Sequence, residues 1–224
     1  MATGARQVKF RLYLITDRKL VRSGNLYEAC EQVLAAPADR PGAIAIQLRE
    51  KDLEGRALYE LALRMRELCT RYGAPLLIND RIDVAIACGA DGVHLPANSF
   101  TPEQARALLG ESRLIGVSTH SSAEVAQAAS AGADFVVYGP VFQPLSKTAG
   151  YGAARGAEGL GAACRAAPIP VYALGGITAE RMHRLTGTGL AGAAAIGAVL
   201  GAEAPGAAAR ALLAAVEQVC AAAG

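Results

Sequence analysis

The stretch PLLINDRIDVAIACGADGVHL, residues 75–95, contains the pattern of a strand, a helix and a second strand. Its ends, 75–78 and 92–95, are short β-rich runs that do not alternate with charged residues, as is typical of parallel strands covered on both faces. Residues 81–88 between them have the apolar spacing of a short helix. The stretch therefore predicts one βα unit followed by the strand of the next.

The same alternation extends from this stretch toward both ends of the chain. Further strand-like runs are 11–16, 43–49, 114–118, 135–139, 170–174 and 193–197, and further helical segments are 25–36, 54–72, 102–109, 122–131, 156–166, 178–187 and 205–222. Eight βα units predict an α/β fold, a (β/α)₈ TIM barrel, as a single domain over residues 1–224. A doubly wound sheet is the alternative, but the chain lacks the G-x-G-x-x-G turn usual after an early strand of that fold.

Composition argues against several classes of partner. The net charge of +2, from 22 basic and 20 acidic residues, includes no basic stripe, so we expect no nucleic acid. No apolar run approaches a membrane span, and the N-terminus lacks the apolar core of a signal peptide, so we expect a cytoplasmic protein. The 5 cysteines form no C-x-x-C pair, which indicates free thiols. The sequence is compatible with a homo-oligomer.

Polar residues follow the second and third predicted strands. Gln47, Arg49 and Lys51 are spaced by two, so they begin on one face, and we expect that face to point into the barrel mouth and bind an anion. A solvated strand end is the alternative for these three. Asn79 and Asp80 end the third strand. Asp80 is predicted either to cap the following helix or to hold Mg²⁺ against a phosphate.

Histidines mark the fourth and fifth strands. His120 follows the fifth strand in GVSTHSS, two residues after Ser118, where an imidazole is within reach of chemistry. His94 ends the fourth strand. Its position is equally consistent with a residue of the site and with a packed core imidazole. His183 lies on a predicted helix and has no claim to a site.

Glycine turns follow the last two strands. Gly175 and Gly176 end the seventh strand, and Ile196 and Gly197 end the eighth, each just before a helix. Backbone N–H groups at these two loops commonly bind phosphate in this fold. Tight turns without a ligand are the alternative for the glycines.

The segment 143–156, rich in Gly and Pro, is predicted to be a long loop over the mouth. Lys147, beside Ser146, could reach back as a point charge for a pyrophosphate or could be solvated. The glycines around it suit a lid that closes over substrate.

In order and spacing, seven motifs of this chain form a recognisable series. They are Q-L-R-E-K (47–51), L-I-N-D-R (77–81), G-A-D-G-V-H-L (89–95), I-G-V-S-T-H (115–120), G-A-D-F-V-V-Y-G-P-V-F (132–142), A-L-G-G-I (173–177) and A-I-G-A-V (195–199). From residue 11 to about residue 199 the chain resembles the thiamine phosphate synthases and their relatives, the thiazole tautomerases.

The resemblance implies a transferase of thiamine biosynthesis that joins hydroxymethylpyrimidine diphosphate to a thiazole phosphate and releases pyrophosphate. It implies diphosphate ligands at Gln47, Arg49, Lys51, Asn79 and Lys147, with Ser146 beside them. It further implies Mg²⁺ on Asp80, Ser118 near the leaving group and pyrimidine, and thiazole phosphate on Gly176 and the Ile196-Gly197 turn.

Three departures from the family pattern affect these expectations. The synthases usually have Gly-Gln-x-Asp after V-H-L, and the Asp is a second magnesium ligand, whereas here Ser99 ends P-A-N-S (96–99). The loop after the sixth strand loses the first hydroxyl of a usual Thr-x-Thr-Lys, and Gly197 stands where a Ser is usual. We therefore expect weaker magnesium binding than at a two-carboxylate site.

Two other functions stay open at this point. A thiazole tautomerase would need no diphosphate and would use His120 as general acid and base on a carboxythiazole phosphate. A non-catalytic protein that binds a thiamine precursor would keep the phosphate glycines and lose the charged strand ends. Because most of the charged strand ends are present, we favour the synthase.

Overall fold

The computed structural model describes residues 7–37, 39–143, 152–166 and 168–222. Its strands pair in parallel in chain order, and the eighth pairs with the first, so the sheet is a closed barrel. The strands are β1 (Leu12–Ile15), β2 (Ile44–Leu48), β3 (Leu76–Asn79), β4 (Gly92–Leu95), β5 (Leu114–Thr119), β6 (Phe135–Tyr138), β7 (Val171–Ala173) and β8 (Gly192–Ala195). The predicted (β/α)₈ barrel is confirmed, and every strand overlaps its predicted run, although β3 and β5 end one residue later and β8 begins one residue earlier than predicted.

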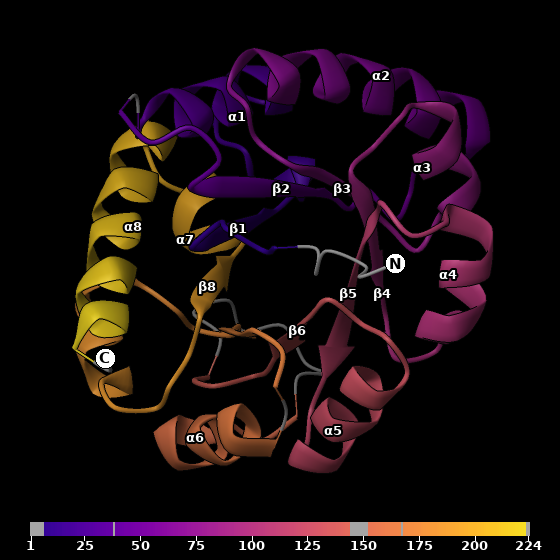
Figure 1. Ribbon diagram of the computed structural model, residues 1–224. Coiled ribbons are helices and arrows are strands. Elements are labelled where there is room, and N and C mark those ends of the chain that lie inside the picture. Colours follow the sequence, from indigo (N-terminus) through magenta and orange to yellow (C-terminus); the bar gives the residue numbers. More distant parts are fainter. Residues whose placement is uncertain (1–6, 38, 144–151, 167, 223–224) are drawn as a thin grey trace.

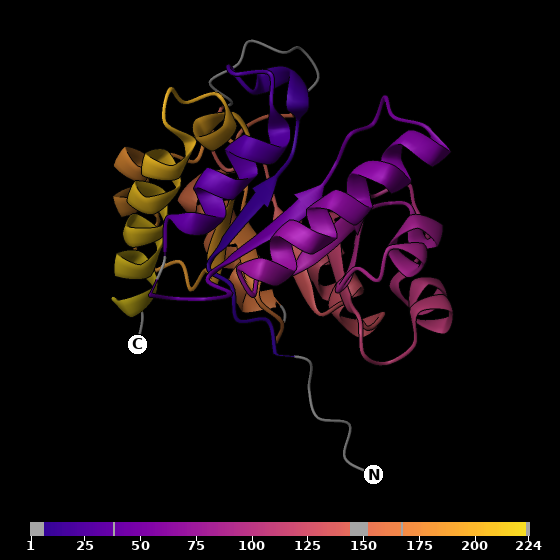
Figure 2. The same ribbon diagram turned by 90° about the horizontal axis from the view of Figure 1, so that it is seen from above.

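Helices surround this barrel (Figures 1 and 2). They are α1 (Leu26–Ala35), α2 (Gly55–Arg71), α3 (Ile82–Ala87), α4 (Pro102–Leu109), α5 (Ser122–Ser130), α6 (Gly156–Ala166) and α8 (Pro205–Ala221). Within the described ranges, no helix combines the length and the hydropathy that crossing a bilayer requires.

Three short helical segments differ from the predicted pattern. The segment predicted over 178–187 is a 3₁₀ helix, η2 (Ala179–Leu185), and its buried residues, Met182 and Leu185, are three apart, which matches the three-residue turn. Two further segments were not predicted: η1 (Arg18–Leu20) and α7 (Gly197–Leu200). Each is a single short turn, too brief to produce a periodic apolar signal.

Helix α2 shows why the sequence folds in this way. Its buried residues, Leu58, Ala62, Met65, Leu68 and Cys69, recur at steps of three and four and form one apolar stripe. Burying a Leu or Met side chain of this kind contributes roughly 1.5–3 kcal/mol. Packing of this stripe against the barrel therefore supplies most of the helix's stability.

Aromatic rings fill the interior of the barrel toward the amino ends of the strands. Phe10, Tyr13, Phe135 and Tyr172 contact one another with ring centroids 4.9–6.5 Å apart. Gly116 on β5 makes room for them, because a Cβ there would lie 2.3 Å from the Phe135 ring. This end of the barrel is a packed core, which leaves polar chemistry to the carboxyl ends of the strands.

Two aspartates fasten the amino ends of the strands. Asp134 accepts the N–H of Ile115 at 2.7 Å and pairs with Arg106 on α4, also at 2.7 Å. Asp91 accepts the N–H of Leu76 at 2.7 Å in the same manner. Both aspartates come from the repeated Gly-Ala-Asp motif. The motif lies far from the mouth, and its function here is structural.

Candidate functional site

Four of the predicted site residues lie just after strand ends. Arg49, Asp80, His120 and Gly176 follow β2, β3, β5 and β7. Since all strands of the barrel are parallel, these residues share its carboxyl end. Lys147, like Ser146, lies outside the described residues.

The Gln-Arg-Lys row passes from the barrel interior to the surface. Gln47 is 1% exposed and donates from Nε2 to the Tyr13 hydroxyl at 3.3 Å. Arg49 is half-buried, and its backbone N–H donates to Thr16 Oγ1 at 2.9 Å. Lys51 is exposed in the turn after the strand. Arg49 is thus the member of the row at the rim, between the core and the solvent.

An ion-pair cluster holds the loop that carries Arg49 and Lys51. The buried carboxylate of Glu50 accepts the backbone N–H of Arg18 and its guanidinium, each at 3.1 Å. Arg18 also donates to both oxygens of Asp52, at 2.7 and 2.9 Å. The pKa of Asp52 falls to about 2, chiefly because Lys19 and then Arg18 donate to its carboxylate. Sequence reasoning missed this cluster, although the acidic residues that flank Lys51 were a signal.

Asp80 has an unusual backbone at the end of β3. Its φ is +65°, the left-handed region that Asp and Asn tolerate better than other non-glycine residues. Its backbone N–H donates to the carbonyl of His94 at 2.9 Å, and Ser99 Oγ donates to Asp80 Oδ1. The alternative that Asp80 caps the next helix is wrong, because Arg81 is the N-cap of α3 and no side chain caps it.

The oxygens around Asp80 suit a hard cation that also contacts a substrate. Asp80 supplies one carboxylate, and Ser99 supplies a hydroxyl beside it. Among the described residues, no group of three or more His, Cys, Asp or Glu could hold a metal by itself. Mg²⁺ is commonly bound through one or two carboxylates plus substrate phosphates and water. The donor set therefore fits a magnesium ion shared with a phosphorylated substrate.

His94 and Ser118 meet inside the barrel just below the mouth. His94 is 2% exposed, and its Nε2 lies 2.9 Å from Ser118 Oγ on the adjacent strand. Burial, and secondarily the charge of Arg49, lowers the pKa of His94 to about 3, so the ring is neutral at pH 7. The packed environment expected for His94 is present, together with a polar contact that the sequence did not predict.

His120 is exposed at the end of β5. Its Nδ1 lies 2.7 Å from the carbonyl oxygen of Gly139, and its backbone N–H donates to Glu124 at 2.7 Å. A carbonyl oxygen only accepts, so Nδ1 carries a proton and Nε2 of the neutral ring has the free lone pair. The ring is therefore oriented by the protein, with one nitrogen left to exchange a proton.

The two glycine turns provide backbone donors. Gly175 and Gly176 have φ values of +100° and +60°, and a Cβ on Gly176 would lie 2.4 Å from the carbonyl oxygen of Gln143. Gly197 begins α7, whose first N–H groups have no partner within the helix. Figure 1 places α7 inside the ring of helices, next to β1.

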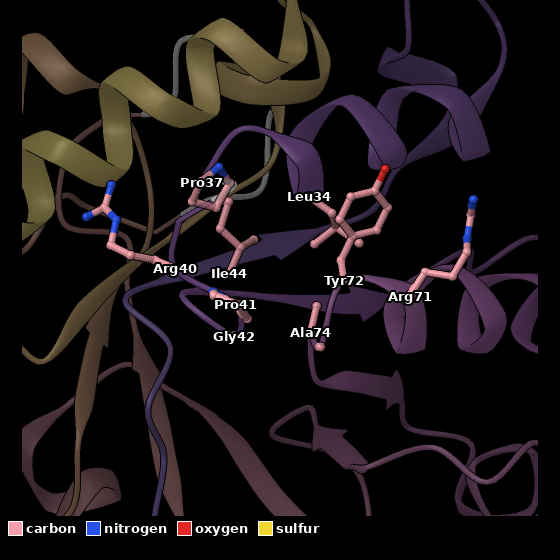
Figure 3. Close-up of a pocket in the computed structure, with 10 residues that line it drawn as sticks. Leu34, Pro37, Arg40, Pro41, Gly42, Ile44, Arg71, Tyr72 and Ala74 are labelled. Atoms are coloured by element: carbon pink, nitrogen blue, oxygen red, sulfur yellow. The ribbon is translucent and has the colours of Figure 1, made fainter.

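Two hollows lie at the opposite end of the barrel. One of about 220 Å³ lies where α1, α2 and β2 meet, with Leu34, Ile44 and Tyr72 between Arg40 and Arg71 (Figure 3). Arg40 pairs with Glu217 and Arg71 with Glu31, so both guanidinium groups are already neutralised. We interpret this hollow as a gap in packing.

Comparisons with known proteins agree with the motif series. The family model described as thiamine monophosphate synthase matches residues 12–199. A relative from Geobacter sulfurreducens is 47% identical over 208 residues, 93% of this chain and 95% of the relative. The thiamine-phosphate synthase of Clostridium acetobutylicum is 35% identical over 213 residues, 95% of this chain and 98% of that protein.

A solved structure shows the same relationship in three dimensions. The thiamine phosphate pyrophosphorylase from Pyrococcus furiosus superposes with a TM-score of 0.82 at 35% identity and covers 95% of this chain and 98% of its own. The matches to the family model, to the relatives and to the solved structure all span nearly the whole barrel. The chain belongs to the thiamine monophosphate synthase family.

Proposed function

We propose that this protein is a thiamine phosphate synthase, a transferase that joins hydroxymethylpyrimidine diphosphate to a thiazole phosphate with release of pyrophosphate. The observation that carries the proposal is the position of Arg49 and Asp80 directly after the paired strands β2 and β3, at the same end of the barrel. A cation and a carboxylate at one end of the barrel are the arrangement that a magnesium-bound diphosphate requires.

The diphosphate would lie on the side of the mouth formed by β2 and β3. Arg49 is fixed there through Thr16 and can bind phosphate oxygens bidentately, while exposed Lys51 adds a point charge. Asn79 offers an amide on the adjacent strand end. Gln47 lies deeper, and we assign Ser146 and Lys147 to the same group by family pattern.

Asp80 would hold Mg²⁺ jointly with the diphosphate, with Ser99 beside it. When bound, the ion would neutralise charge that develops on the leaving group. Hydrogen bonds from Arg49 and Ser118 would stabilise the same charge as the bond between the pyrimidine methylene carbon and the diphosphate oxygen breaks. The thiazole nitrogen then donates its electron pair to that carbon, and the carbon–nitrogen bond of thiamine phosphate forms.

The thiazole phosphate would lie across the mouth, on the turns that follow β7 and β8. Gly176 brings the backbone close without a side chain, and Gly197 begins α7, whose first N–H groups have no partner within the helix. This placement puts the two phosphorylated substrates on opposite sides of the barrel axis. Their reacting atoms would then meet above Ser118.

The tautomerase reaction is the second candidate, because His120 is held by Gly139 in the form that a general base needs. The wild type should be assayed with both substrate sets, beside Asp80→Ala and His120→Asn. Asp83→Ala and His183→Asn are matched controls, since Asp83 pairs with Arg81 on the surface and His183 is exposed on η2.

A synthase should lose its activity in Asp80→Ala, because the leaving group's charge is no longer neutralised. A tautomerase should tolerate Asp80→Ala and lose about 10²–10⁴ in rate in His120→Asn. Turnover of carboxythiazole phosphate alone would refute the synthase. Turnover of neither substrate set would favour a binding protein.

A further inference from the structure

The contact between His94 and Ser118 raises the question of which nitrogen of the ring carries the proton. His94 Nε2 is 2.9 Å from Ser118 Oγ, whereas Nδ1 is buried and has no hydrogen-bond partner among the described residues. The ring packs between Tyr13 and Phe135, at centroid distances of 5.7 and 6.1 Å. A second proton on this ring would create a buried charge whose Nδ1–H has no acceptor among the described residues, so the ring carries only one.

The two neutral forms of His94 differ in what they do to Ser118. With the proton on Nδ1, the buried Nδ1–H would have no acceptor among the described residues, and Nε2 would accept a hydrogen bond from the Ser118 hydroxyl. With the proton on Nε2, the ring donates to Ser118 Oγ, and only a lone pair on Nδ1 stays unpaired. Orphaned buried N–H groups are the rarer case in folded proteins, which favours the second form.

We propose that His94 is a positioning residue, which donates from Nε2 to Ser118 Oγ and so directs the Ser118 hydroxyl proton outward as a donor to a phosphate oxygen. Ser118 is half-buried on β5, between buried His94 and the open end of the barrel. The Ser118 hydroxyl proton is then not used by His94 and is available to an acceptor at the mouth. The inference rests on the proposed function, because the acceptor would be an oxygen of the diphosphate.

Nitrogen-15 NMR of the histidine rings tests the proton's location without any substrate. The chain has only 3 histidines, so the His120→Asn and His183→Asn variants assign the signals. We expect the Nε2–H form for His94, with its Nε2 signal moved by Ser118→Ala. Thr119→Val is the matched control, because that neighbouring hydroxyl contacts the carbonyl of Val137 at 3.4 Å instead. An Nδ1–H form, or no response to Ser118→Ala, would overturn the inference.

Binding of inorganic pyrophosphate with Mg²⁺, measured by calorimetry, tests the consequence. His94→Leu should weaken binding roughly tenfold, the worth of one ordinary hydrogen bond, and His94→Gln should restore most of it with an amide N–H. In a Ser118→Ala background, His94→Leu should have little further effect. Additive losses would overturn the inference. Failure of the wild type to bind pyrophosphate would overturn the proposed function, and the NMR measurement alone would then decide which nitrogen of His94 is protonated.

Discussion

Ser99 Oγ donates a hydrogen bond to Asp80 Oδ1, although the two residues follow different strands, β4 and β3. Ser99 occupies the place where the family's second magnesium carboxylate is usual. The contact shows that a side chain at this position reaches Asp80 directly. A carboxylate there would therefore share any cation that Asp80 holds.

We predict that Ser99→Asp raises magnesium affinity, because a second hard oxygen ligand would face the same ion. The magnesium dependence of pyrophosphate binding, followed by calorimetry, checks this. Asn98→Asp adds the same charge on a neighbouring exposed residue and should change the affinity little. Equal behaviour of the two variants would contradict the shared site.

The two glycine turns should respond differently to substitution. One variant should lower the stability of the fold, and the other should weaken phosphate binding. Gly176→Ala should destabilise the fold by roughly 2 kcal/mol or more, since φ is +60° and the new Cβ would collide with Gln143. A Cβ at Gly197 would lie 3.7 Å from Leu20, an ordinary contact distance, so Gly197→Asp should leave the melting temperature nearly unchanged. Its carboxylate should nevertheless weaken thiazole phosphate binding in calorimetry by repelling the phosphate. Unchanged affinity in Gly197→Asp would argue against a phosphate at α7.

The stability of the barrel should depend on Asp134. Its side chain is 7% exposed in the pair with Arg106, and Asp134→Ala would leave that largely buried guanidinium without its carboxylate and the N–H of Ile115 without its acceptor. We expect a loss of about 3 kcal/mol in urea unfolding. Glu60→Ala, which removes an exposed pair with Arg56, should cost less than about 0.5 kcal/mol. Equal costs for the two variants would contradict this account of the barrel's amino end.

Acid stability should carry a component from His94. Burial lowers the folded-state pKa to about 3, whereas the ordinary value is 6.5, so the unfolded chain binds the extra proton between these two pH values. Folding stability should therefore be complete above pH 6.5 and should fall toward pH 3, by on the order of 1 kcal/mol per pH unit. In His94→Gln this component should vanish, while His183→Gln should keep it. Urea unfolding at several pH values measures the difference, and parallel profiles for wild type and His94→Gln would refute it.

The sequence determined the barrel and the strand ends at which its chemistry lies. Apolar runs near residues 12–15 and 92–95, and the helical spacing of Leu58, Ala62 and Met65, are local signals that the chain carries by itself. Because all strands of a (β/α)₈ barrel are parallel, their carboxyl ends lie together, and the predicted fold assigns Arg49 and Asp80 to one mouth.

Only the tertiary structure decided which side chains meet there. The contacts of Ser99 with Asp80 and of His94 with Ser118 join residues 19 and 24 positions apart, on different strands or loops. A sequence pattern tells which face of a strand a residue occupies. The stagger between strands and the left-handed turn at Asp80 decide the partner and the distance, and both arise from closing the barrel as a whole.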